Sequence, residues 1–388
     1  MTVVSAGTAE ASPPHIRAQC LASGTAGEAL LHIAHARTGF GSTWQAHQVL
    51  ATCACDLIAD EHASLYLGAP AAAFALHTAA SSIGGYENAL RLLDDTVVRI
   101  TQRRLEAAHA RIDRRQRPDL NEYDLFYGLT GLGAYLLCRD ADSPTLKAVL
   151  AYLVRLTRPL PRDDQRLPGW WSRQGPSGRI TERFPRGHAN LGMAHGVAGP
   201  LALLSLAARR GTLVDAQRDA IEHICAWLDT VRTDTQSGTR WPYWITTPTE
   251  KAKEETRRAH RPRPSWCYGT PGLARAQQLA GIALDDPERQ RLAEHAMLAC
   301  LSDRSQLARV SDAGICHGAA GILQTLHRMA EDAPATFTTH RPRLHALLRQ
   351  HAPTSRGFLN GTHGVALAAL TAKTPTMPCG WDACLLLA

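Results

Sequence analysis

The segment GAAGILQTLHRMA at residues 318–330 contains the pattern that decides the fold. Two glycines separated by two residues lead directly into a run of small and apolar side chains. Glycine lets the backbone turn tightly and approach a neighbour, and a thin helix that is largely apolar must be buried. A degenerate copy begins at Gly68, where Ala71 replaces the second glycine. The other copies begin at Gly24, Gly128, Gly196, Gly269 and Gly361.

The spacing of these copies predicts a ring of helices. Successive copies begin 43 to 73 residues apart, which is about the length of two helices with their loops. Amphipathic stretches such as 215–232 and 286–302 lie between the apolar runs and predict an outer layer. Neither end carries a polar capping repeat, which favours a closed ring over an open solenoid. We therefore predict an all-α fold with one domain over residues 1–388, an α/α toroid (barrel) of seven helical hairpins in inner and outer helix layers.

The composition excludes several classes of protein. With 388 residues, 45% hydrophobic and 20% charged, the chain can bury a large core and is not disordered. Ten cysteines are too few for a disulfide scaffold, the first residues do not form a signal peptide, and no apolar run reaches the length of a transmembrane segment. We therefore expect a cytoplasmic protein with reduced thiols. The net charge of +7 comes from scattered arginines without a recognition motif, so no nucleic acid partner is expected.

Two long inserts, at residues 158–188 and 233–265, interrupt the helical rhythm. Loops of this length are commonly functional or disordered, and we expect these two near the active-site face. Their tryptophans have two interpretations, an apolar wall for a peptide or packing beneath their own loops. These residues are Trp170, Trp171, Trp241 and Trp244.

The residues just before the first glycine of each copy occupy equivalent positions at the loop tip that enters an inner helix. In a closed ring these tips converge, and cysteine and histidine cluster in them. Cys267, Cys316 and His317 provide two thiolates and one imidazole, a set that suits tetrahedral zinc. Three protein ligands leave one position open, which is typical of a catalytic site. The alternative is that both cysteines are ordinary buried core residues.

Three further residues are candidates with weaker support from the sequence. His195 immediately precedes Gly196, and its register favours a catalytic role. Asp124 lies four residues before Gly128, and its position alone indicates an ordinary helix cap. Arg263 lies four residues before Cys267 in a basic loop.

At these residues the sequence resembles the lanthionine synthetase C-like family, the zinc cyclases of lantibiotic biosynthesis. Three motifs carry the resemblance in the correct order, NLGMAHGVAG (190–199), WCYGTPG (266–272) and CHGAAG (316–321). The resemblance implies an α/α toroid in which Cys267, Cys316 and His317 hold Zn²⁺. It also implies that the active-site histidine and aspartate are His195 and Asp124. The characteristic arginine, tryptophan and tyrosine of the family fall on Arg263, Trp266 and Tyr268, and we expect these three to be catalytic residues as well.

The resemblance further implies a reaction. A peptide cysteine adds to a dehydroalanine or dehydrobutyrine that a dehydratase has made, and the product is a lanthionine or methyllanthionine ring. We expect His195 to supply the proton at Cα, Arg263 to stabilise the enolate oxygen and Asp124 to orient this network. His363, within GTHG, is expected to be a loop residue rather than a fourth ligand.

The expected partners are a dehydrated precursor (leader-core) peptide, a separate dehydratase and a transporter in a biosynthetic complex. The expected location is the cytoplasm, with membrane association through that complex. Two alternatives are a relative that adds glutathione or another small thiol to dehydrated residues, and a non-catalytic zinc-bearing scaffold.

Overall fold

Seven helices form an inner ring in the part of the chain that the computed structural model describes, residues 13–160, 167–175, 178–236, 238–246, 263–337, 340–353, 355–374 and 379–388. Six of them begin directly after the first glycine of a copy, and α9 begins two residues after Gly196. The inner helices are α2 (Thr25–Thr38), α4 (Ala69–Ile83), α7 (Leu129–Arg139), α9 (Ala198–Arg209), α12 (Thr270–Leu284), α15 (Ala319–Asp332) and α18 (Thr362–Lys373).

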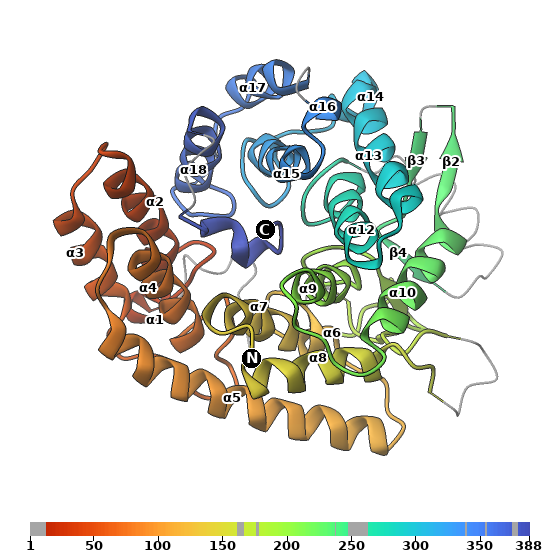
Figure 1. The fold of residues 1–388 in the computed structure, drawn as a ribbon, viewed down its shortest axis with the longest axis horizontal. Coiled ribbons are helices and arrows are strands. Elements are labelled where there is room, and N and C mark those ends of the chain that lie inside the picture. Colours follow the sequence, from red (N-terminus) through yellow and green to blue (C-terminus); the bar gives the residue numbers. More distant parts are fainter. Residues whose placement is uncertain are drawn as a thin grey trace.

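A second layer of helices surrounds this ring (Figure 1). The outer helices are α3 (Thr43–Cys53), α5 (Glu87–Asp113), α8 (Pro144–Leu156), α10 (Gln217–Val231), α13 (Pro287–Ser302) and α17 (Arg341–Gln350). Shorter helices connect the layers, namely α1 (Pro14–Ala18), α6 (Leu120–Tyr123), α14 (Arg304–Leu307) and α16 (Pro334–Phe337). None of the helices in the described ranges has both the length and the apolar character that crossing a membrane requires.

The ring is closed. Each inner helix contacts the next along the chain, and the last, α18, contacts the first, α2. This arrangement confirms the predicted α/α toroid. In the described part of the chain, α18 is followed by the 3₁₀ helix η3 (Trp381–Leu385), which turns into the middle of the ring rather than joining the outer layer (Figure 1). The seventh inner helix therefore pairs with a central segment.

In every copy except the one at Gly68, which has Ala71 at this position, the second glycine allows the inner helix to press against the loop that precedes it. A Cβ atom at Gly321 would lie 1.9 Å from the carbonyl oxygen of Ile315, and one at Gly272 would lie 2.0 Å from that of Trp266. Real Cβ atoms do not approach a backbone oxygen so closely, so any other residue would push the loop away. The glycine pattern therefore brings each loop tip against the start of its helix.

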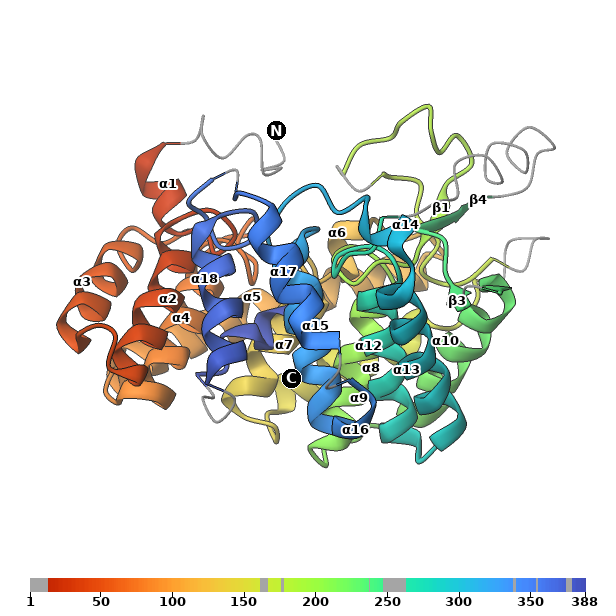
Figure 2. The ribbon, with the colours of Figure 1, turned by 90° about the horizontal axis from the view of Figure 1, so that it is seen from above.

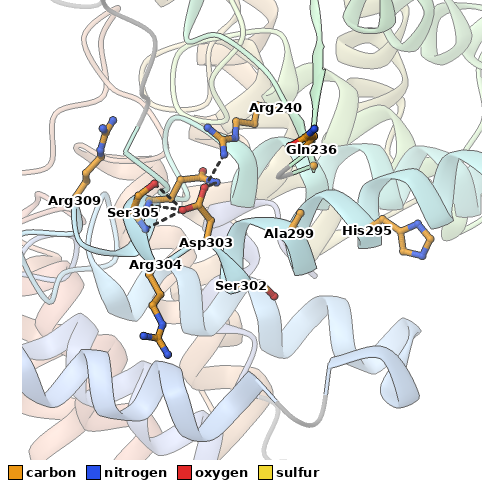
Figure 3. A pocket seen from close by; sticks show the side chains of 11 residues that line it. Gln236, Arg240, His295, Ala299, Ser302, Asp303, Arg304, Ser305 and Arg309 are labelled. Carbon is orange, nitrogen blue, oxygen red and sulfur yellow. Dashed lines mark hydrogen bonds and ion pairs between the residues drawn. The ribbon is translucent and has the colours of Figure 1, made fainter.

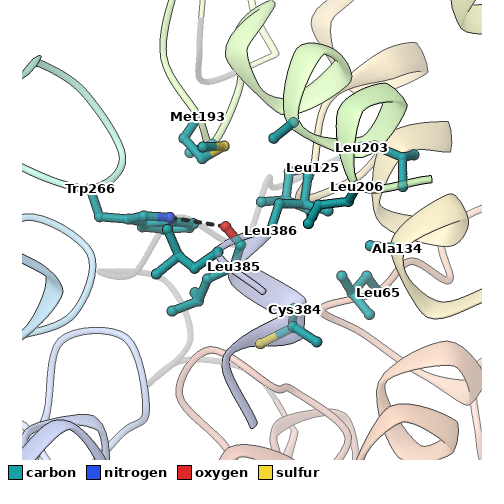
Figure 4. Packing of buried hydrophobic residues seen from close by; sticks show 14 of the residues in the cluster. Leu65, Leu125, Ala134, Met193, Leu203, Leu206, Trp266, Cys384, Leu385 and Leu386 are labelled. Atoms are coloured by element: carbon teal, nitrogen blue, oxygen red, sulfur yellow. Dashed lines mark hydrogen bonds between the residues drawn. The ribbon is translucent and has the colours of Figure 1, made fainter. Parts of the chain in front are cut away.

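The central segment is fixed by hydrogen bonds from the surrounding ring. The indole N–H of Trp266 donates to the Leu385 carbonyl (3.1 Å), and the Tyr66 hydroxyl donates to the Cys384 carbonyl (2.8 Å). The buried Arg275 donates twice to the Leu387 carbonyl. Figure 4 shows Leu385 and Leu386 among apolar side chains of the ring. The centre of the toroid is thus filled by the last residues of the chain.

The two inserts contribute the strands. Strand β1 (His188–Asn190) ends the first insert and pairs antiparallel with β4 (Trp244–Thr246) of the second. A separate hairpin joins β2 (Thr233–Thr235) to β3 (Gly238–Arg240). Figure 2 shows β1 and β4 at the same edge of the ring as α1 and α14. Residues 161–166 and 176–177 of the first insert, and 237 and 247–262 of the second, lie outside the described residues.

The structure separates the four tryptophans of the inserts. Trp170, Trp171 and Trp241 are at most 3% exposed and pack within the core. Trp244, at the start of β4, is half-buried. The packing interpretation therefore holds for three of these residues, and Trp244 alone remains available to form part of a wall.

Candidate metal centre and catalytic residues

The loop tips of neighbouring copies are joined by backbone hydrogen bonds. The N–H of Cys267 donates to the carbonyl of Cys316 (3.1 Å), and the N–H of Cys316 donates to that of Leu359 (2.9 Å). The N–H of Leu359 donates in turn to the carbonyl of Ala22 in the first copy (2.9 Å). This belt of hydrogen bonds holds the equivalent tip residues of adjacent copies side by side, as their register predicted.

Cys267, Cys316 and His317 come together in one cluster, which we call the metal group. Their ligand atoms lie within 4.8 Å of one another, and no other such group of three occurs among the described residues. Two sulfurs and one imidazole nitrogen at this separation fit zinc, because thiolate and imidazole are its preferred ligands. Asp312 connects this group to its loop, since its Oδ2 lies 3.4 Å from His317 Nε2 and its Oδ1 accepts the N–H of Gly314.

One thiol of this group differs from the other buried thiols. A hydrogen bond from Cys316, with a further one from His317, holds the pKa of Cys267 well below its ordinary value despite burial. Burial is the main cause that raises the pKa of Cys225 and Cys300 to about 12. Cys267 therefore favours the thiolate form that a metal ligand requires, whereas Cys225 and Cys300 remain protonated at neutral pH.

His195 and Asp124 form a direct pair. His195 Nδ1 lies 2.6 Å from Asp124 Oδ2, and their side chains are 16% and 1% exposed. The other carboxylate oxygen, Oδ1, accepts the N–H groups of Tyr127 and Gly128 at the start of α7. Asp124 therefore orders the loop that enters α7 rather than capping the helix itself, which has no side-chain cap, and it is also the partner of the candidate catalytic histidine.

Tyr268 and Arg263 lie on either side of the Cys267 loop. The Tyr268 hydroxyl accepts a hydrogen bond from Asn190 Nδ2 (2.9 Å), and the Arg263 carbonyl accepts one from the Tyr243 hydroxyl (2.8 Å). Arg263 Nε is buried without a hydrogen-bond partner in the described part of the chain. A hydrogen bond with Cys267 and burial raise the pKa of Cys316, and the charge of Arg263 opposes this rise. The charge of Arg263 therefore influences the Cys316 thiol, and its Nε–H remains available as a hydrogen-bond donor.

Two residues that the sequence singled out, Trp266 and His363, have surroundings that differ from those expected. Trp266 is fully buried, and its indole N–H is used by the central segment, so its contacts are those of a packing residue. His363 lies in the first turn of α18 rather than in a loop, because α18 begins at Thr362. Within the described residues, His363 is not part of the metal group.

Sequence reasoning missed Asn190, Tyr243 and Asp312. A signal for two of them was available, because Asn190 and Asp312 both lie six residues before the first glycine of their copy, as Arg263 does. Both use a side-chain oxygen to accept the backbone N–H two residues later. A search of the position six residues before each first glycine would therefore have found Asn190 and Asp312.

A groove of about 820 Å³ lies between the β2–β3 hairpin and the junction of α13 with α14 (Figure 3). Its floor contains Asp303, which accepts a hydrogen bond from Arg240 (2.7 Å). The residues lining this groove include no cysteine and none of the candidate site residues. The size of this groove therefore does not mark it as the candidate site. The candidate metal centre is marked by the clustered ligand atoms of Cys267, Cys316 and His317.

Comparison with known proteins agrees with this geometry. The family described as lanthionine synthetase C-like protein matches residues 16–386. Nisin biosynthesis protein NisC of Lactococcus lactis subsp. lactis is 26% identical over 269 residues, a match that spans 67% of this chain and 60% of that protein. A solved structure named nisin cyclase superposes with a TM-score of 0.78 at 22% identity, covering 96% of this chain and 93% of the other.

Proposed function

The chain belongs to the lanthionine synthetase C-like protein family, and we propose that it is a zinc-dependent lanthipeptide cyclase. It would add cysteine thiols of a substrate peptide to dehydroalanine or dehydrobutyrine, forming lanthionine or methyllanthionine rings. The observation that carries this proposal is the convergence of Cys267, Cys316 and His317 in one group. The relative named above supports it through its role in nisin biosynthesis.

Cys267, Cys316 and His317 would hold the metal and leave one position for a substrate sulfur. Zinc, when bound, supplies a lowered pKa for a coordinated thiol, so that the thiol is present as thiolate near neutral pH. Two protein thiolates place negative charge on the site, which keeps the substrate sulfur nucleophilic.

His195 would supply the proton that completes the addition. The substrate sulfur forms a bond to Cβ of the dehydro residue, and the electron pair of the carbon–carbon double bond moves toward Cα and the adjacent carbonyl. A proton from His195 then adds to Cα and completes the addition. Asp124 supports this role because it accepts the Nδ1 proton and leaves Nε2 as the nitrogen that exchanges a proton with substrate.

Arg263 would stabilise the carbonyl oxygen as negative charge develops on it. Its buried Nε has no partner within the described residues, and an unused charged donor is suited to an oxyanion that exists only during the reaction. Tyr268 is the second candidate at this position, although its hydroxyl already accepts a hydrogen bond from Asn190.

The biological setting follows from the same proposal. The substrate would be a dehydrated precursor peptide, and the dehydratase would be a separate protein, joined with a transporter in a complex. The cyclase would act in the cytoplasm, with any membrane association provided by that complex. Of these partners, the dehydratase follows from the chemistry, because the dehydro residue must be made before the thiol can add to it.

The test is to incubate the zinc-loaded protein with dehydrated precursor and to count free thiols by alkylation and mass spectrometry. Loss of thiols without a change in peptide mass supports cyclisation. Persisting thiols would reject it. Adding glutathione separates the alternative, because a small-thiol transferase increases the peptide mass by one glutathione per dehydro residue. His195→Ala should abolish ring formation while retaining zinc, and loss of zinc instead would make His195 a ligand.

A further inference from the structure

Tyr268, on the loop of the metal group, forms a cluster with two aromatic side chains that have no part in the proposed chemistry. The ring of Tyr243 lies 5.4 Å from that of Tyr268 and 5.6 Å from that of Trp244. Trp244 and Tyr268 are 6.3 Å apart. All three rings meet at inclined or edge-on angles, the favoured geometry for aromatic contacts. We call Tyr243, Trp244 and Tyr268 the aromatic triad.

The pairing of the two inserts places the triad at the metal group. In the β1–β4 register Asn190 faces Trp244, so the second insert reaches the copy that contains His195. Tyr268 directly follows the candidate ligand Cys267. The side chain of Tyr268 fits there because residue 192 is glycine, where a Cβ atom would lie 2.7 Å from the tyrosine ring. Tyr268 therefore joins the triad to the loop that carries Cys267.

The polar atoms of the two tyrosines are already occupied. The Tyr268 hydroxyl accepts a hydrogen bond from Asn190, and the Tyr243 hydroxyl donates to the Arg263 carbonyl. The Arg183 guanidinium carbon lies 4.4 Å from the centre of the Trp244 ring, and Phe184 packs against the same indole. These contacts hold the rings in place, and what the triad can offer a ligand is apolar ring surface.

The three rings are each partly exposed, in contrast to the other tryptophans of the inserts. Clustered apolar surface that remains accessible in a folded protein commonly marks a binding site. A ligand for such rings should be flat and apolar. A dehydro residue is flat, because its carbon–carbon double bond is conjugated with the adjacent amides, and it has lost the hydroxyl of its parent serine or threonine.

We propose that the aromatic triad is the subsite that holds the dehydro residue of the substrate peptide against the metal-bound thiolate. This inference rests on the proposed function for the identity of the substrate. The second insert supplies Tyr243 and Trp244, and the first insert supports the indole through Arg183 and Phe184. Tyr243 and Trp244 would thereby select the unsaturated residue over its saturated counterpart.

The experiment measures binding without catalysis. The probe is a synthetic peptide with one dehydrobutyrine and no cysteine, compared with the same peptide containing 2-aminobutyrate in its place. Titration calorimetry on the zinc-loaded protein gives both affinities. We expect the wild type to prefer the dehydrobutyrine peptide, and Trp244→Ala to weaken that peptide's binding by about tenfold while leaving the saturated peptide unchanged.

Trp44→Ala is the matched control, because Trp44 is 68% exposed on α3 and far from the triad in sequence. It should leave both affinities unchanged. Trp244→Phe keeps an aromatic ring and should retain most of the preference, whereas Trp244→Leu and Tyr243→Leu should lose it. If Trp244→Ala does not fold, the comparison of Trp244→Phe with Trp244→Leu decides.

Two results would overturn the subsite: no preference for the unsaturated peptide in the wild type, or a preference that survives Trp244→Leu and Tyr243→Leu. Failure of the proposed function has a different signature. In that case a dehydrated peptide that contains cysteine keeps its thiols with the wild type, even though the dehydrobutyrine probe binds in a Trp244-dependent way.

Discussion

His195 Nδ1 and Asp124 Oδ2 are 2.6 Å apart, and the second oxygen of the same carboxylate accepts the N–H groups of Tyr127 and Gly128, just before α7. One buried side chain therefore connects the position of the histidine to the loop that enters an inner helix. A carboxylate can only accept at this contact, so it holds the Nδ1 proton and the orientation of the imidazole ring. The contribution of Asp124 to activity can therefore be measured while His195 itself is left unchanged.

Asp124→Asn should lower cyclisation by about 100-fold, because the imidazole loses the carboxylate that accepts its Nδ1 proton. The amide oxygen can still accept the N–H groups of Tyr127 and Gly128, so the thermal unfolding temperature should change little. Asp286→Asn is the control, because Asp286 also accepts two backbone N–H groups, at the start of α13, and this variant should leave cyclisation unchanged. Equal activity losses in the two variants would show that the pairing of Asp124 with His195 is not the cause.

Cys316→Ser should weaken zinc binding by about 100-fold or more, because it removes one of three proposed ligands. A competing chelator measures the affinity, and mass spectrometry of iodoacetamide-treated protein maps the thiols. Zinc should protect Cys267 and Cys316 of the wild type from alkylation. Cys55, which is exposed, should react with or without zinc, and Cys55→Ser should bind zinc normally. Zinc stoichiometry that survives Cys316→Ser would contradict the ligand set.

Trp266→Phe separates packing from catalysis at a position that the family resemblance marked. The variant loses the hydrogen bond to Leu385, and an unsatisfied buried carbonyl costs about 1–3 kcal/mol of unfolding free energy. Trp241→Phe should cost the same, since its indole N–H donates to the Leu228 carbonyl. Per zinc-loaded molecule, both variants should keep their turnover. A large loss of turnover in Trp266→Phe with unchanged stability would instead make the indole a catalytic group.

His188 should make the fold sensitive to acid. It is fully buried and stacks on Phe184 at 3.9 Å, and burial lowers its pKa to about 4. The unfolded chain binds a proton near pH 6.5 and the folded chain does not, so stability falls as the pH drops from about 6.5 to 4. The loss at pH 5 is about 2 kcal/mol.

His188→Leu should flatten this part of the stability profile, which denaturant unfolding at pH 7, 6 and 5 measures. His295→Leu, at an exposed position on α13, should leave the profile as it is in the wild type. A profile for His188→Leu that is parallel to the wild type would place the acid sensitivity elsewhere.

The ring and the metal group were predictable from the sequence because both follow from one steric fact. In six of the seven copies the second glycine sits where a Cβ atom would strike the preceding loop, so the pattern marks the places where a loop tip meets its inner helix. The copy at Gly68 has Ala71 there and is recognised by its first glycine and its apolar run. Equivalent tips then converge in a closed ring, and Cys267, Cys316 and His317 could be grouped by register. Asn190 and Asp312 share a register too, and a search six residues before each glycine would have found them.

Other features depended on contacts that no local pattern contains. Whether Trp244 faces its own loop or the metal group is decided by the pairing of β4 with β1, which joins segments far apart in the chain. The packing of Trp266 depends on Leu385, in a segment that fills the ring rather than covering it. His363 was expected in a loop because GTHG contains two glycines, yet its copy begins the helix at Thr362 as the others do.

The hydrogen bond from Leu359 to Ala22 has a consequence for the time course of folding. It joins the first copy to the last, so this hydrogen bond cannot form until nearly the whole chain has been made. The other side of the first tip has an earlier partner, because the N–H of Leu21 donates to the carbonyl of Tyr66 in the second copy. Contacts between residues as distant as Ala22 and Leu359 form slowly, because the intervening chain must first be ordered. One side of α2 can therefore pack early against α4, whereas its other side meets α18 only when the ring closes. A chain released before residue 359 would contain both candidate metal-binding cysteines but no closed ring.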